Sequence, residues 1–371
     1  MHSISAKRVW TSKGWLENAR VILNDGRIER IVKNAEENCD VPMLVPGMTE
    51  LHVHGSLGYS VQNLDDDGTS AWLRRLAKHG VTSVLPSPST APIDVMHASV
   101  ERFARIMENP IKDGAEVLGI HLEGPFVSEI KKGAMDVRHM LAPTIENYQS
   151  LVYGCEKAIK LITLAPELPG ALELIRYLRR QNVWVNAGHS NATFDEMNLA
   201  ISQGVNGVTH FFNASRAIHH REPGMLVAAM LSPDVYCELI GDLVHVHAGI
   251  LRLMMQTIGA RRVALITDAV RLTGEPDGRY ENIIVTNGSP KKLDGTLSGG
   301  CKMMDEIVRG LIADIGLDPW DVFCAACNTP VRRIGVLGLG DIAPLYKANL
   351  VAFDDSYHVM LVVIDGEEVR I

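Results

Sequence analysis

The chain of 371 residues lacks most features that mark secreted, membrane-bound or nucleic-acid-binding proteins. Its six cysteines are scattered, and residues 1–7 contain no apolar signal core, so we expect reduced thiols and a cytoplasmic location. No apolar run approaches the length of a membrane span. The net charge is −8 and Lys and Arg form no cluster, which argues against nucleic acid or a membrane surface as a partner.

One cysteine pair has a spacing that needs interpretation. Cys324 and Cys327 are separated by two alanines, as in a redox or zinc pair, but they lie in an apolar stretch that begins at Val322. The sequence offers no second pair to complete a zinc site. Free cysteine behaves as a small core residue, so we interpret the pair as buried helix packing.

The sequence does contain a regular alternation of short apolar runs and helical segments. Eight runs are typical of buried strands, at 41–45, 81–85, 117–123, 159–165, 183–187, 205–209, 236–240 and 263–267. Helical apolar spacing occurs between them, at 71–78, 95–107, 145–158, 171–180, 194–202 and 250–258. Eight strand–helix units with right-handed crossovers can close a parallel barrel. The predicted fold is therefore α/β, a (β/α)8 TIM-like barrel over residues 46–340.

The two ends of the chain predict a second, all-β unit. Short strands are expected near the N-terminus at 6–10, 19–23 and 27–32, with a hairpin turn at Asn24-Asp25-Gly26. Matching strands are expected near the C-terminus at 350–353, 359–364 and 369–371. We expect segments 1–45 and 341–371 to form one small β-sandwich domain.

Residues that can bind a divalent metal lie at or just beyond the ends of the apolar runs: His52, His54, Glu123, His189, His210 and Asp268. In a parallel barrel the carboxyl ends of the strands converge, so residues far apart in sequence meet there. A one-residue spacer sends both imidazoles of the His-x-His pair to one strand face, where burial requires a common partner. Glu123, which precedes Gly124-Pro125, could instead be a structural acid that forms a turn, but its position at a strand end favours a role as a metal ligand. The pattern predicts a metal-dependent hydrolase.

His121 differs from these candidates. It shares a strand face with Glu123 but lies two residues earlier, deeper in the predicted barrel. We therefore expect His121 to pack or to form hydrogen bonds rather than to bind the metal.

Several short segments together carry a family resemblance: Pro46-Gly47 with the His-x-His pair, HLEGPF at 121–126, GHS at 188–190, THFFNA at 209–214, HREPG at 220–224 and TDA at 267–269. They resemble the N-acetylglucosamine-6-phosphate deacetylases of the amidohydrolase superfamily, and the resemblance runs through the whole chain. The His-x-His pair and Asp268 mark only the superfamily. The HLEGPF, HFFNA and REPG segments are more specific to the deacetylase branch.

The resemblance implies a reaction. Glu123, His189 and His210 would bind one divalent ion and the His-x-His pair would complete a second site, so one or two ions, Zn²⁺ or Fe²⁺, are expected. Asp268 would also touch the metal and would shuttle the proton from water to the leaving amine. The implied substrate is N-acetylglucosamine 6-phosphate, with N-acetylgalactosamine 6-phosphate, or a cyclic amide, as alternatives. A scaffold without catalysis would have no reason to keep buried paired imidazoles.

The resemblance also implies substrate contacts, at Ala134, Asn213, Ala214, Arg221, His245, Leu297, Ser298 and Gly299. Arg221 and His245 would bind the phosphate, with Arg221 supplied across a homodimer interface; the alternative for Arg221 is a surface ion pair with Glu222. The loop 131–134 is expected to close over the sugar. Met135 stands where the family has a histidine that contacts the acyl carbonyl, and a thioether cannot donate a hydrogen bond.

Overall fold

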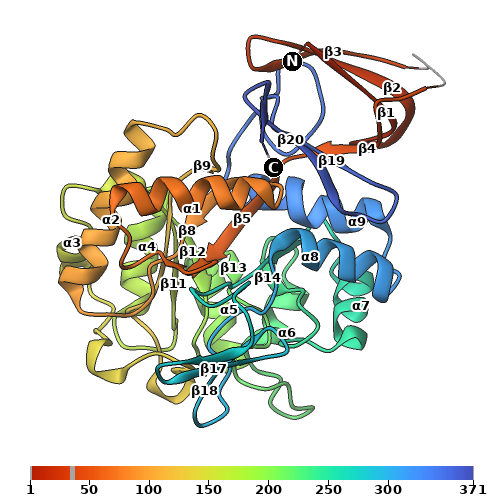
Figure 1. Cartoon of the computed structure of the whole chain (residues 1–371). Coiled ribbons are helices and arrows are strands. Elements are labelled where there is room, and N and C mark those ends of the chain that lie inside the picture. Colours follow the sequence, from red (N-terminus) through yellow and green to blue (C-terminus); the bar gives the residue numbers. More distant parts are fainter. Residues whose placement is uncertain (1, 34–37, 371) are drawn as a thin grey trace.

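The computed structural model describes residues 2–33 and 38–370. Both ends of the chain lie in one seven-stranded sheet, at the top of Figure 1. Its strands are, in spatial order, β21 (Glu367–Val369), β20 (Val359–Ile364), β19 (Leu350–Phe353), β4 (Val41–Pro46), β1 (Ser3–Thr11), β2 (Gly14–Asn24) and β3 (Arg27–Val32). β19 pairs antiparallel with β4, and this pairing joins the two ends of the chain.

The terminal sheet bends around a small apolar core of its own. The backbone N–H of Ile28 on the outer strand β3 donates to the carbonyl of Tyr346, and the N–H of Leu345 donates back to Ile28, each at 2.8 Å. These bonds bring the sheet edge to the segment that precedes β19. The core so enclosed includes Val9, Val21 and other buried side chains.

Parallel strands form the centre of the molecule. One curled sheet contains β10 (Ile120–Glu123), β11 (Ile159–Leu164), β12 (Trp184–Ala187), β13 (Gly207–Val208), β14 (Tyr236–Ile240) and β15 (Val263–Ile266). A second contains β5 (Met48–Val53), β8 (Val81–Pro86) and β9 (Glu116–Val117). Ser89 pairs with Glu123, and the N–H of Asp268 donates to His52 O at 3.0 Å, so the two sheets are linked at both ends.

Helices cover the outside of the parallel strands (Figure 1). They are α1 (Asp66–Lys78), α2 (Ile93–Glu108), α3 (Ile145–Val152), α4 (Ala171–Arg180), α5 (Phe194–Gln203), α6 (Gly224–Leu231), α7 (Ala248–Thr257), α8 (Met304–Arg309), α9 (Pro319–Phe323) and α10 (Thr329–Arg333). Side chains cap several N-termini; Thr193 and Glu196 form a reciprocal capping box at α5. Within residues 2–33 and 38–370, no helix combines the length and apolarity needed to cross a membrane.

A separate antiparallel sheet follows β15 and lies at the end of the molecule away from the terminal sheet (Figure 1). It contains β16 (Gly278–Tyr280), β17 (Ile283–Thr286) and β18 (Ser289–Lys292); a two-stranded ribbon, β6 (Gly55–Ser56) with β7 (Tyr59–Ser60), follows β5. Lys292 ends β18, and its Nζ donates to the carbonyl of Ala134 at 2.7 Å. This sheet was not predicted from the sequence.

The prediction of the first central strand was wrong. Residues 41–45 form β4 of the terminal sheet, and β5, which carries His52, takes the expected place beside β8. Only Gly47 separates the two strands, and a Cβ atom at Gly47 would collide with the side chain of Thr82. Two apolar runs therefore follow each other with a one-residue break, which apolarity alone does not reveal.

Other predicted boundaries shift by smaller amounts. The run 117–123 is divided, because β9 pairs with β8 while β10 begins at Ile120. The helix expected over 145–158 ends at Val152, and a 3-10 turn (Glu156–Ala158) follows. The last strand covers 367–369 rather than 369–371, and Ile371 lies outside the described residues. Cys324 and Cys327 are buried in a π-helical turn, as the packing interpretation predicted.

Candidate active site

The candidate ligands meet where the parallel strands end at their carboxyl side. Glu123 is the last residue of β10, and the others lie near the ends of β5, β12, β13 and β15: His52, His54, His189, His210 and Asp268. Three of the six adopt positive φ, with +45° at His189, +29° at His210 and +51° at Asp268. Non-glycine residues rarely occupy this region, and such strain persists where surrounding bonds hold it. Here Gly300 N–H donates to Asp268 O at 2.6 Å.

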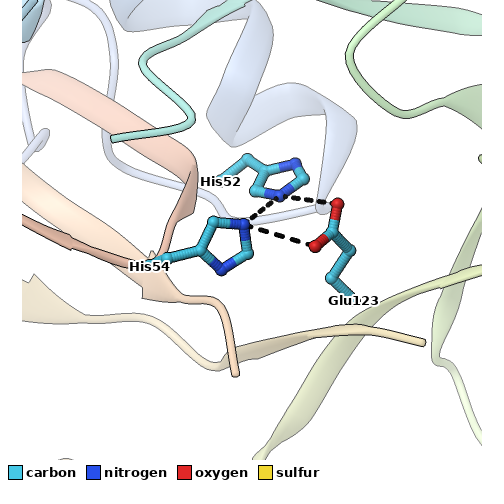
Figure 2. A group of neighbouring side chains, drawn as sticks. All are labelled: His52, His54 and Glu123. Atoms are coloured by element: carbon cyan, nitrogen blue, oxygen red, sulfur yellow. Dashed lines mark hydrogen bonds and ion pairs between the residues drawn. The ribbon is translucent and has the colours of Figure 1, made fainter. Parts of the chain in front are cut away.

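Glu123 lies at the centre of this cluster. Its Oε1 is 3.1 Å from His189 Nε2 and 3.0 Å from His210 Nε2. The same carboxylate is 3.3 Å from Nε2 of both His52 and His54, and Figure 2 shows the two imidazoles turned toward it. The carboxylate therefore bridges two pairs of histidines.

The Nδ1 atom of each imidazole contacts an oxygen that can only accept a hydrogen bond. The partners are Glu238 Oε2 for His52 (3.3 Å), Ser87 O for His54 (2.6 Å), Lys131 O for His189 (2.8 Å) and Asn213 O for His210 (3.1 Å). Each Nδ1 therefore carries a proton, which leaves Nε2 of the neutral ring as an acceptor that faces the cluster. Within each pair the two Nε2 atoms are only 3.1 Å apart. Two lone pairs at that distance require a cation between them.

The electrostatics of the cluster lead to the same conclusion. Burial opposes a charged imidazole at His54, but Glu123 and Asp268 outweigh burial and raise its pKa to about 9. Burial also opposes ionisation of Glu123, but the histidines hold its pKa well below the ordinary range. The carboxylates thus demand positive charge at the Nε2 atoms, and a divalent cation satisfies that demand without protonating the rings.

The donor set fits one or two divalent ions. One group comprises His52, His54 and Glu123, and another comprises Glu123, His189 and His210; within each, the ligand atoms lie within 4.8 Å of one another. Imidazole nitrogen together with carboxylate oxygen suits Zn²⁺ and Fe²⁺ better than Mg²⁺ or Ca²⁺. Asp268 Oδ1 lies 3.2 Å from His54 Nε2 and 3.6 Å from His52 Nε2, at the edge of the first group.

The cluster opens into a cavity of about 740 Å³. Its walls contain all but one of the residues expected to contact substrate: Ala134, Asn213, Ala214, His245, Leu297, Ser298 and Gly299. Arg221 lies outside the cavity of its own chain, on an exposed segment, where its Nη1 is 2.9 Å from His220 Nε2. The ion pair considered for Glu222 is made by Arg216 instead, at 4.0 Å.

Asp242 holds His245 in the cavity wall and was not predicted as part of the site. Its Oδ2 accepts from His245 Nδ1 at 2.7 Å, and its Oδ1 accepts from the N–H groups of Val244 and His245 at 2.9 and 2.8 Å. Burial favours the neutral imidazole, but the bond to Asp242 outweighs it and raises the pKa of His245 to about 10. His245 is thus a cation in the cavity. Its signal in the sequence was weak, since Asp242 simply follows an apolar run.

The region around Met135 contains a second feature that the sequence did not reveal. Met135 lines the cavity, and its sulfur accepts a hydrogen bond from Thr90 Oγ1 at 3.1 Å. Lys292, from the antiparallel sheet, lines the same cavity and binds the neighbouring carbonyl of Ala134. The sheet that carries Lys292 has no sequence motif, so only the structure brings this cation to the site.

Comparison with known proteins agrees with this geometry. Residues 43–369 match the amidohydrolase family. The chain is 34% identical to an N-acetylgalactosamine-6-phosphate deacetylase of Escherichia coli O157:H7, over 99% of this chain and 98% of that protein. It is 30% identical to an N-acetylglucosamine-6-phosphate deacetylase of Vibrio furnissii, over 98% and 94%. The chain belongs to the N-acetylglucosamine-6-phosphate deacetylase family of amidohydrolases.

Solved structures extend the similarity of this amidohydrolase to its fold. An N-acetyl-D-glucosamine-6-phosphate deacetylase from Mycobacterium smegmatis superposes with a TM-score of 0.93 at 31% identity and 100% coverage of both chains. A variant of that protein, in complex with N-acetyl-D-glucosamine-6-phosphate, gives the same TM-score with 99% coverage. The similarity therefore includes the terminal sheet as well as the parallel strands.

We predict that the purified amidohydrolase contains Zn²⁺ or Fe²⁺ and that Glu123→Gln loses it. The amide keeps the shape of the side chain but removes the charge shared by both ligand groups. Elemental analysis of the two proteins is the measurement. Glu116→Gln is the matched control, because Glu116 pairs with Lys347 away from the cluster and its loss should leave metal content unchanged. Full activity in a preparation with only trace transition metal would contradict the prediction.

Proposed function

We propose that this amidohydrolase removes the acetyl group from an N-acetylated amino sugar 6-phosphate, giving acetate and the free amino sugar phosphate. The observation that carries the proposal is a single cavity lined both by the imidazoles and carboxylates of the cluster and by His245, whose pKa is raised to about 10 by Asp242. Such a cavity suits a substrate with both an amide and a phosphate. N-acetylglucosamine 6-phosphate is our first candidate, because proteins named for it recur among the relatives. N-acetylgalactosamine 6-phosphate is the second, given the 34% identity to the E. coli protein.

The architecture we propose has two parts. The linked parallel sheets support a closed (β/α)8 barrel over residues 46–340, since Asp268 and Glu123 join them at opposite ends. The curled terminal sheet, with its own apolar core, supports a β-sandwich domain made of residues 1–45 and 341–371. Active sites of such barrels lie at the carboxyl ends of the strands, where the ligand cluster lies.

Amide hydrolysis needs an activated water, a polarised carbonyl and a protonated leaving amine. A divalent ion held by the cluster would supply the first two by lowering the pKa of its water and by acting as a Lewis acid. Asp268 has the position for the third task, because its carboxylate reaches the cluster at His54 and also lines the cavity. The neighbouring imidazoles outweigh burial and lower the pKa of Asp268, so the group is ionised and can take the proton of the water. It then delivers this proton to the amine nitrogen.

The phosphate would lie at His245. Asp242 fixes the imidazolium of His245, and Asn213 and Ala214 line the same cavity. Arg221 is exposed and lies outside this cavity. We propose that in a homodimer it contacts the phosphate of the substrate that is bound in the cavity of the other chain. A guanidinium binds phosphate in a bidentate manner, which suits that task.

Asp268→Asn should reduce the rate of acetate release by about a hundredfold to ten-thousandfold, because the amide cannot accept the proton. Binding of the sugar phosphate should persist, since Asp268 acts on the proton and not on the phosphate. Kinetics and calorimetry on the same preparation measure both, with metal content checked in parallel. Near-normal turnover in this variant would assign the proton shuttle to another group.

Arg221→Lys should raise KM for the phosphorylated sugar and leave activity on its unphosphorylated counterpart unchanged, because lysine cannot copy the two-point contact. Equal effects on both substrates would make Arg221 structural.

Subunit mixing tests the dimeric arrangement separately. At a concentration of the phosphorylated sugar well below the KM of Arg221→Ala, subunits with Arg221→Ala or with Asp268→Asn should each have little activity alone. A hybrid dimer would regain one complete site, so an equal mixture should recover about a quarter of the wild-type activity if subunits assort at random. An arginine that acts within its own chain would give no recovery.

Asp242→Asn should make phosphate recognition sensitive to pH. The variant loses the negative charge that raises the pKa of His245, so this pKa should fall toward its ordinary value of about 6.5. In the wild type the imidazolium persists up to about pH 10. KM for the phosphorylated sugar should therefore rise in the variant between about pH 6 and about pH 9 and stay flat in the wild type. Parallel pH profiles of the two proteins would contradict the role of Asp242.

A further inference from the structure

Beneath the ligand cluster, the interior of the parallel strands contains polar side chains where an apolar core is expected. They are His121, Thr163, Asn186, Thr209, Glu238 and Arg333, and none exposes more than 2% of its surface. Burying a carboxylate and a guanidinium is costly unless both are paired and hydrogen bonded. A barrel interior filled with aliphatic side chains would avoid this cost, so the network needs a reason.

The directions of its hydrogen bonds follow from Arg333. A guanidinium can only donate, so Arg333 Nη2 donates to Asn186 Oδ1 at 2.7 Å. This fixes the amide, whose Nδ2 must point the other way. Its two hydrogens go to Glu238 Oε1 at 2.6 Å and to Thr209 Oγ1 at 3.0 Å. Glu238 is therefore an acceptor held in place by an amide that Arg333 orients.

The other oxygen of Glu238 reaches the ligand cluster. Oε2 lies 3.3 Å from His52 Nδ1, and the carboxylate again only accepts, so the proton of His52 resides on Nδ1. Its Nε2, 3.3 Å from Glu123 Oε1 and 3.1 Å from His54 Nε2, is left with a lone pair. His52 is thereby held in the one tautomer that can donate to a metal between these groups.

His52 differs in this respect from the other three histidines. His54, His189 and His210 each direct Nδ1 to a backbone carbonyl, at 2.6, 2.8 and 3.1 Å. A backbone acceptor cannot be lost by substitution of a side chain, whereas the acceptor of His52 can. His52 is the one imidazole of the cluster whose orientation depends on a side chain from another strand.

We infer that Glu238 is a positioning residue that fixes His52 in its metal-binding tautomer, and that Asn186 and Arg333 hold Glu238 for this purpose. The inference rests on the metal-dependent reaction proposed above, but it concerns metal binding alone and can fail or succeed whatever the substrate is. It predicts that the network controls the ion held by His52 and His54 and leaves the ion held by His189 and His210 unaffected.

Glu238→Gln is the sharpest variant. Glu238 accepts from two donors, Asn186 and His52, whereas a glutamine amide offers one acceptor oxygen and one NH₂ group. Arg333 fixes Asn186 as a donor, so the glutamine oxygen should stay with Asn186 and its NH₂ group should face His52. This favours protonation of His52 on Nε2, the atom that the metal needs.

Thr163→Val is the matched control. Thr163 belongs to the same buried network, but its contacts are with Thr209 at 2.6 Å and His121 Nε2 at 2.8 Å, and this arm ends on Leu51 O through His121 Nδ1. The substitution replaces a buried hydroxyl by a methyl group of similar size, and the hydroxyl makes no hydrogen bond to Glu238 or His52. This control therefore measures how much Zn²⁺ affinity is lost when the buried network is disturbed at a position that does not hold Glu238.

The experiment is a titration of the metal-free protein with Zn²⁺ against a chromophoric chelator. Wild type and Thr163→Val should bind two ions alike, while Glu238→Gln should bind one of them about 10- to 100-fold more weakly and the other normally. Unchanged binding of both ions by Glu238→Gln, equal weakening of both, or wild-type protein that binds only one ion would overturn the inference.

A second measurement is made on the wild-type protein and does not depend on the folding of Glu238→Gln. In the Zn²⁺-loaded wild type labelled with ¹⁵N-histidine, two-bond ¹H–¹⁵N spectra report which ring nitrogen carries the proton. His52, assigned by its absence in His52→Gln, should show a protonated Nδ1 and a metal-bound Nε2. A metal-bound or unprotonated Nδ1 would refute the role of Glu238.

Discussion

The site depends on the approach of four imidazole Nε2 atoms to one buried carboxylate. The carboxylate oxygens of Glu123 lie 3.0 to 3.3 Å from the Nε2 atoms of both pairs, and within each pair the two Nε2 atoms are 3.1 Å apart. Because every Nδ1 is committed to an oxygen acceptor, the lone pairs can be reconciled only by positive charge at the centre. The positive φ values at His189, His210 and Asp268 follow from the same demand, since the chain must turn sharply at the strand ends to direct these side chains inward.

The acceptors for Nδ1 connect the cluster to the surrounding layers. The carbonyl of Lys131 orients His189, so the loop that borders the cavity also positions a ligand. The next residues of this loop are held by Lys292 from the antiparallel sheet through Ala134. Movement of the loop would therefore change the position of His189. On the opposite side, Glu238 connects His52 to Arg333 at the end of α10.

The sequence predicted which candidate ligands lie together, because their signals are local. Each candidate ligand lies beside the end of an apolar run, and strand ends of parallel sheets converge whatever the details of the fold. Helix 171–180 and strand 27–32 agree with the structure to the residue; Pro169-Gly170 precedes the helix, and the turn Asn24-Asp25-Gly26 precedes the strand. Residues 41–45 were predicted as the first central strand, but they form β4 of the terminal sheet, and β5 is the central strand. Apolarity does not show which of two adjacent runs belongs to which sheet.

Residues that act through long-range contacts could not be found in this way. Glu238 and Lys292 lie in stretches without a motif, and their partners His52 and Ala134 are 186 and 158 residues away. Asp242 contacts His245, three residues later, but nothing in the sequence shows that this pair lines the cavity. The exposed position of Arg221 was likewise open in the sequence, where a surface ion pair and a contact to phosphate were both compatible with its neighbours. The structure pairs Glu222 with Arg216 and places Arg221 outside the cavity, so its contact to phosphate stays a prediction that requires a second chain.

The central claim is that one cavity joins a metal centre to a cationic subsite for phosphate. The most direct test measures acetate release from N-acetylglucosamine 6-phosphate and from unphosphorylated N-acetylglucosamine, each with metal-stripped and with Zn²⁺-reloaded protein. The account predicts that only the reloaded protein is active and that it strongly prefers the phosphorylated sugar in kcat/KM. Activity that survives stripping, or equal kcat/KM for the two sugars, would contradict it.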